Sequence, residues 1–94
     1  MQESLKYKIL KNISDDPKIT QRQLAKKLDM SLGKANYCLR ALIYKGLIKA
    51  ENFKTSNNRK AYLYKLTPTG IDEKARVAVC FLKMKMREYE EVKA

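Results

Sequence analysis

The chain has no histidine, few glycines and few acidic residues for its length. Its 94 residues include 10 aspartates and glutamates against 21 lysines and arginines, for a formal net charge of +11 at pH 7. Without histidine or a glycine-rich phosphate loop, it lacks the usual groups of acid–base and nucleotide-dependent catalysis. We therefore expect no enzyme, cofactor or metal site. The excess of positive charge favours a polyanionic partner such as nucleic acid.

Long apolar runs are also missing. The longest, from Val77 to Leu82, is much too short to cross a membrane. The first residues show no basic segment followed by an apolar one, so we expect no signal peptide and a cytoplasmic protein. Cys38 and Cys80 both lie in apolar stretches of expected helices. We predict that they are reduced, buried thiols, with a redox switch as the alternative.

Three short helices are expected in the first half of the chain. Apolar residues recur every four positions and predict a helix over about residues 2–14, which ends before Pro17. The adjacent Asp15 and Asp16 predict a turn, because no third type of metal ligand accompanies them. A second helix begins after Thr20. Thr20 and Gln23 form the pattern of a capping box, and Ile19 and Leu24 that of a hydrophobic staple.

The third helix has the pattern of a DNA-recognition helix. Ser31 is its expected N-cap and Gly46 follows its last turn. The apolar face consists of Ala35, Cys38, Leu39, Leu42 and Ile43, and the opposite face of Lys34, Asn36, Tyr37, Arg40 and Tyr44. No acidic residue lies between Ser31 and Lys45, which suits insertion into a major groove.

After Gly46 the spacing of apolar residues is no longer helical, and the pattern becomes that of a β-hairpin. Residues 47–53 and 61–66 are predicted strands, joined by the polar and basic residues 54–60. This tip can place Lys54, Arg59 and Lys60 against phosphates or in a minor groove. Asn57 and Asn58 are either turn formers or further contacts. Tyr62 and Tyr64 are expected to pack in the hairpin core, with stacking on RNA bases as the alternative.

A long last helix is expected from Pro68 to about Val92, with Thr67 as its N-cap. Its middle is apolar on all sides, so it is expected to pack against its own domain on one side and a second copy of the chain on the other. The alternatives are packing within one domain, or partial strand structure. The predicted dimerisation residues are Ile71, Ala75, Ala78, Phe81, Leu82, Met86 and Tyr89.

These elements predict a single α+β domain, mostly α, over residues 1–94. Residues 1–67 would be the DNA-binding core with a hairpin wing, and residues 68–94 the dimerisation helix. The segments Ile19–Leu28, Ser31–Leu42, Lys45–Ile48 and Leu66–Gly70 resemble the MarR family of winged helix-turn-helix regulators in bacteria. The resemblance covers roughly residues 5–75. It is strongest to short members found with exopolysaccharide (EPS) gene clusters.

The resemblance implies a homodimer on a palindromic operator, with the third helix in the major groove and the hairpin tip on the minor groove. It also implies that Ser31, Lys34, Asn36, Tyr37 and Arg40 face the groove and that Arg59 is the wing arginine. The family's usual aspartate before that arginine is replaced by asparagine. The chain also lacks the longer flanking helices that form the family's ligand pocket, which argues against a small-molecule effector.

Side-chain chemistry suggests a role for each contact. Lys34 and Arg40 are candidates for guanine edges and Asn36 for adenine, while Tyr37 suits a phosphate or a thymine methyl. The expected phosphate and backbone contacts are Ser31, Gly33, Tyr44 and Lys45. We thus predict a double-stranded DNA-binding regulator, by default a repressor. The alternatives are a protein-interaction winged helix and a nonspecific nucleic-acid-binding protein.

Overall fold

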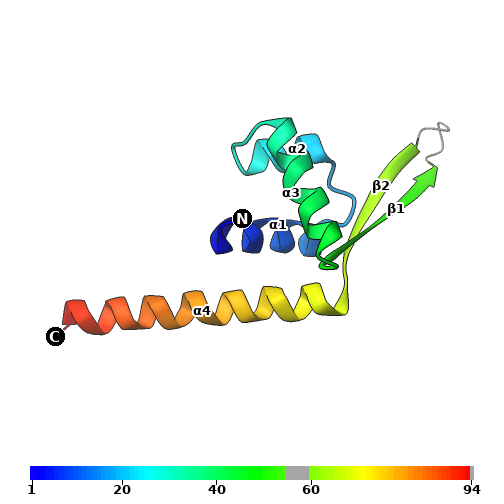
Figure 1. Cartoon of the computed structure of the whole chain (residues 1–94). Coiled ribbons are helices and arrows are strands. Elements are labelled where there is room, and N and C mark those ends of the chain that lie inside the picture. Colours follow the sequence, from blue (N-terminus) through cyan, green and yellow to red (C-terminus); the bar gives the residue numbers. More distant parts are fainter. Residues whose placement is uncertain (55–59, 94) are drawn as a thin grey trace.

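The computed structural model describes the backbone of residues 1–54 and 60–93, and the side chains of residues 1–52 and 62–92. The order of elements is α1 (Glu3–Asp15), α2 (Gln21–Lys27), α3 (Leu32–Tyr44), β1 (Ile48–Lys54), β2 (Lys60–Leu66) and α4 (Pro68–Lys93). Figure 1 shows α4 running alongside α1 and continuing past its N-terminal end, while the hairpin projects away from the helices. The predicted helix-rich α+β architecture is confirmed.

Hydrogen bonds between residues close in the sequence fix the two ends of α2. Thr20 Oγ1 accepts a hydrogen bond from the Gln23 backbone N–H at 3.1 Å, and Gln23 Oε1 accepts from the Thr20 N–H at 3.0 Å. This is the predicted capping box. The helix ends at Lys27, and the following turn contains Asp29, whose φ of 53° lets the Met30 N–H return to the Ala25 carbonyl at 2.9 Å. The resulting turn leads directly into α3.

The ends of α3 are built in the same way. Ser31 Oγ accepts a hydrogen bond from the Lys34 N–H at 3.1 Å, so the predicted N-cap is confirmed. Gly46 has a φ of 77°, and the Leu47 N–H bonds the Leu42 carbonyl at 3.0 Å. Glycine suits this position because other residues adopt the left-handed region at a cost. Helix α3 therefore begins and ends where its sequence indicates.

One apolar core joins α1, α2, α3 and the hairpin. Ile9, Leu24, Leu39 and Ile48 are fully or almost fully buried in it. Ile43 is not part of this core, because it lies at the edge of the apolar face of α3 and is exposed. The core holds α2 and α3 in a fixed relation and leaves the other face of α3 free.

The hairpin is attached to the helices at its base. Its antiparallel register pairs Ile48 with Leu66 and Ala50 with Tyr64. The Tyr64 N–H also donates to the Pro17 carbonyl at 3.0 Å, so the segment between α1 and α2 flanks β2. Tyr64 is buried as predicted. The expectation for Tyr62 is wrong, because its ring stacks on the Tyr64 ring at a centroid distance of 6.2 Å but stays 57% exposed.

The first half of α4 packs on α1. Val77 is fully buried, and the Phe81 ring meets the Tyr7 ring edge to face at 5.9 Å. Past this contact α4 extends beyond α1, so its remaining apolar residues are exposed. The expectation of two buried thiols is wrong for Cys80, which is exposed on α4, and right for Cys38. Cys80 is exposed because it lies on a side of α4 that α1 does not cover.

Candidate nucleic-acid interface

The face of α3 opposite the core is open to solvent. It presents Asn36, Tyr37, Arg40, Ala41 and Tyr44, which line a shallow hollow along the helix. Tyr37 is 74% exposed and Tyr44 is 93% exposed. We call these residues the outer face of α3. Large aromatic side chains left this exposed on a small domain are available for contact with a partner.

The cations on and beside this face have no acidic partner. Among the side chains that the structure describes, no ion pair includes Lys34, Arg40 or Lys45. Some cations on other elements are paired, as for Lys6, whose Nζ lies 2.7 Å from a Glu73 carboxylate oxygen. Glu51 is the single acidic residue between Ser31 and Leu66 in the sequence. This side of α3 therefore carries positive charge that no carboxylate compensates, as expected of a surface that docks a polyanion.

The N-terminus of α3 lies beside these cations. Ser31, Gly33 and Lys34 are all exposed, as expected for residues that would meet a phosphate backbone. A β-carbon at Gly33 would have no neighbour within 4 Å, so packing within the protein does not require glycine at this position. Its lack of a side chain leaves room for close approach to the helix backbone.

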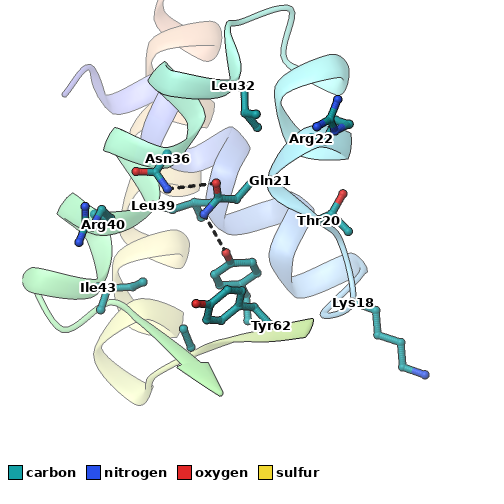
Figure 2. A pocket seen from close by; sticks show the side chains of 12 residues that line it. Lys18, Thr20, Gln21, Arg22, Leu32, Asn36, Leu39, Arg40, Ile43 and Tyr62 are labelled. Carbon is teal, nitrogen blue, oxygen red and sulfur yellow. Dashed lines mark hydrogen bonds between the residues drawn. The ribbon is translucent and has the colours of Figure 1, made fainter. Parts of the chain in front are cut away.

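A groove of about 730 Å³ separates α3 from the hairpin. Gln21 and Arg22 of α2 line one wall, Asn36 and Arg40 of α3 another, and Tyr62 of β2 lies at its base (Figure 2). Arg22 did not stand out in the sequence, because a groove between separate elements has no local pattern. The groove connects the outer face of α3 with the hairpin.

Two hydrogen bonds cross this groove. Asn36 Nδ2 donates to Gln21 Oε1 at 3.1 Å, and Gln21 Nε2 donates to the Tyr64 hydroxyl at 3.3 Å. Figure 2 draws both as dashed lines. Asn36 is half-buried. Its side-chain amide is hydrogen-bonded to Gln21 on one side and reaches the outer face on the other. Sequence reasoning found Asn36 and missed Gln21.

The predicted hairpin contacts are not placed. Asn57, Asn58 and Arg59 lie outside the residues that the structure describes, as do the side chains of Lys54 and Lys60. The strands that lead to them are confirmed, since the register runs to the pair Lys54–Lys60. Their contact with DNA stays a prediction.

The predicted dimerisation residues fall on two sides of α4. Phe81 packs on Tyr7 of the same chain, and Ala78 is half-buried beside it. The others are exposed, with Leu82 at 60%. They are Ile71, Ala75, Leu82, Met86 and Tyr89, which we call the α4 stripe. Successive residues of the stripe are three, four or seven positions apart and so lie along one side of the helix, away from Val77.

Residues 2–49 match a family model described as winged helix-turn-helix DNA-binding. This match covers α1, α2, α3 and the beginning of β1. No curated protein sequence matches the chain. In the described part of the chain, no helix is long and apolar enough to span a membrane.

Solved structures share the fold at low sequence identity. A PadR-like transcriptional regulator from Bacillus cereus is 19% identical with a TM-score of 0.81, over 96% of this chain and 92% of that one. A Streptococcus transcriptional regulator is 14% identical with a TM-score of 0.79, over 98% and 94% of the two chains. Staphylococcus aureus MarR, solved with salicylate and kanamycin, is 23% identical with a TM-score of 0.72, over 92% of this chain.

The present chain spans 56% of the length of the S. aureus MarR chain. At these identities the likeness establishes the shared fold. Together with the family match, it confirms the predicted winged helix-turn-helix, a fold that this chain shares with S. aureus MarR. Membership of the exopolysaccharide-associated subgroup stays a prediction.

Proposed function

Because the chain belongs to the winged helix-turn-helix DNA-binding family, we propose that it is a transcriptional regulator that reads a specific duplex sequence as a homodimer. The family consists of DNA-binding domains and not of enzymes, in agreement with the expectation from the sequence. In this proposal α3 enters the major groove and the hairpin lies along the adjacent minor groove.

The outer face of α3 carries the proposal. Arg40 on this face, and Lys34 and Lys45 beside it, lack carboxylate partners in the described part of the chain, so binding to phosphates would break no ion pair within the protein. Arg40 and Lys34 supply donors for guanine or phosphate oxygens, and Asn36 supplies a donor and an acceptor for adenine. A protein-interaction role is less favoured, because protein interfaces are depleted in lysine.

Dimerisation is proposed through the α4 stripe. A small monomer rarely exposes this much apolar side-chain surface along one helix, and a symmetric copy would cover it with the same residues. A two-fold axis at α4 would present two α3 helices to major grooves about 34 Å apart, which requires a palindromic operator. The proposal includes no small-molecule effector.

The regulatory output is proposed as repression, because a protein on promoter DNA blocks polymerase. The protein would then act in the cytoplasm, on the nucleoid. The resemblance to short regulators of exopolysaccharide clusters makes promoters of such genes the first ones to test.

Selection of bound fragments from a pool of genomic DNA, at moderate salt, tests the function. We expect enrichment of a palindromic sequence that binds at least about 1,000-fold more tightly than unrelated duplex. The matched control is Arg40→Ala, which is expected to enrich the sequence poorly. Enrichment of nothing, or equal affinity for single-stranded RNA and every duplex, would reject sequence-specific regulation.

A further inference from the structure

Besides its apolar contacts with the core, α3 is joined to α2 by a hydrogen bond from one polar side chain of its outer face. Asn36 is half-buried, and its Nδ2 lies 3.1 Å from Gln21 Oε1 on α2. The other end of the Gln21 amide lies 3.3 Å from the Tyr64 hydroxyl on β2. Tyr64 is 3% exposed, which anchors this hydroxyl. Two elements, α2 and β2, thus hold one side chain of the outer face.

An asparagine amide reads bases through the order of its donor and acceptor. It carries two N–H groups and one carbonyl, and the pair formed by one N–H and the carbonyl matches N7 and the N6 amine of adenine. The hydrogen bond to Gln21 uses one N–H group of Asn36. The second N–H and the carbonyl are left for DNA. Turning the amide over would reverse their order and lose the match.

We propose that Gln21 is a positioning residue for base recognition: it fixes the orientation of the Asn36 amide and so creates a preference for adenine at one operator position. The inference rests on the proposed function, because it concerns how the same DNA is read. Gln21 itself touches no base in this account. Tyr64 holds the far end of Gln21 and links the hairpin to this contact.

Substitutions at Gln21 separate orientation from simple packing. Gln21→Glu keeps an acceptor facing Asn36, so it should preserve the orientation. Gln21→Lys offers donors alone and should turn the Asn36 carbonyl towards α2, while Gln21→Met removes both polar groups at similar length. A merely structural role for Gln21 would make no distinction between the glutamate and lysine variants in base preference.

The experiment measures affinities for the selected duplex and for duplexes changed at one position. Asn36→Ala first identifies the position that Asn36 reads. There we expect the full-length wild type to prefer adenine by roughly 5- to 150-fold, the range for one bidentate contact. Gln21→Glu should keep this ratio even if its added charge weakens all duplexes equally. Gln21→Lys and Gln21→Met should reduce it to roughly two-fold or less, with preferences elsewhere unchanged.

The possible failures are distinct. If the wild type shows no preferred duplex, the proposed function fails. If the wild type is specific but all Gln21 variants keep the adenine preference, or Asn36→Ala changes no preference, the inference is overturned and the function stands. If Gln21→Met does not fold, the comparison of adenine preference between Gln21→Glu and Gln21→Lys still tests the inference.

Discussion

Gly70, in the first turn of α4, lies directly against the backbone of Leu47, whose carbonyl oxygen occupies the space that a β-carbon at Gly70 would need. The same carbonyl accepts a hydrogen bond from the Thr67 N–H at 3.1 Å. Thr67 Oγ1 in turn donates to the Gly46 carbonyl at 2.6 Å. The end of α3 and the beginning of α4 are therefore joined backbone to backbone, so the α3 helices of a dimer built on α4 would be held at a fixed spacing.

Gly70→Ala is expected to lower the free energy of unfolding by about 1–3 kcal/mol, because the new methyl group overlaps a backbone atom that cannot rotate away. The matched control is Gly33→Ala, where a β-carbon meets nothing within 4 Å. That variant should gain about 0.5 kcal/mol. Denaturant unfolding at one protein concentration measures both. Equal stability of the two variants would show that the junction tolerates a side chain.

The ion pairs between α1 and α4 predict acid sensitivity. Hydrogen bonds from Arg76, and then from Lys6, lower the pKa of Glu73 from 4.5 to about 2. Since the pKa is depressed in the folded state, this stabilisation is complete above pH 4.5 and is lost as the pH falls towards 2. Glu73→Gln should be less stable than wild type at pH 7, and the difference should shrink over that interval.

Thermal unfolding between pH 2 and pH 7 measures this difference. Glu91→Gln, which makes the same chemical change where no ion pair is found among the described side chains, should leave the pH profile as in wild type. If the stability of Glu73→Gln changes with pH in parallel with that of wild type, the ion pairs of Glu73 do not link α1 to α4.

Arg40 is predicted to contribute to specificity. Because it lies on the outer face of α3 without an acidic partner in the described structure, Arg40→Ala should weaken binding to the selected duplex by about 1–3 kcal/mol and retain most affinity for unrelated DNA. Lys11→Ala removes one charge on α1, where Lys11 Nζ lies 2.9 Å from Asp15, and serves as control. Competition titrations give both affinities. Equal loss on selected and unrelated DNA would assign Arg40 to the phosphate backbone.

The side of α4 that forms the dimer can be tested with a matched pair. Leu82 and Met84 are 60% and 55% exposed, but two residues along a helix place them on opposite sides. Leu82→Arg should produce monomers in analytical ultracentrifugation and weaken operator binding, because it puts a charge in the α4 stripe. Met84→Arg should remain dimeric. A dimeric Leu82→Arg variant and a monomeric Met84→Arg variant would instead place the dimer interface on the side of α4 that carries Met84.

The elements were predictable because their signals are local. The capping box of Thr20 and Gln23, the cap at Ser31 and the left-handed Gly46 each depend on a few neighbouring residues, and all are found. The helical period also predicted which side of α3 would be free.

What could not be predicted depends on how distant elements meet. Cys80 lies in an apolar stretch, but its exposure depends on how α4 is rotated against α1. The different exposures of the stacked Tyr62 and Tyr64 rings, and the hydrogen bonds of Gln21, depend on how α2, α3 and β2 meet. No periodicity in the chain encodes these contacts.

The most direct test of the account is to map the DNA-bound surface by NMR, following backbone amide signals of the full chain as the selected duplex is added. The account predicts that the largest shifts occur at residues 31–45 and in the hairpin strands, with small shifts in α1. Shifts confined to α4, or none at all with a duplex that binds, would contradict the proposal that the outer face of α3 reads DNA.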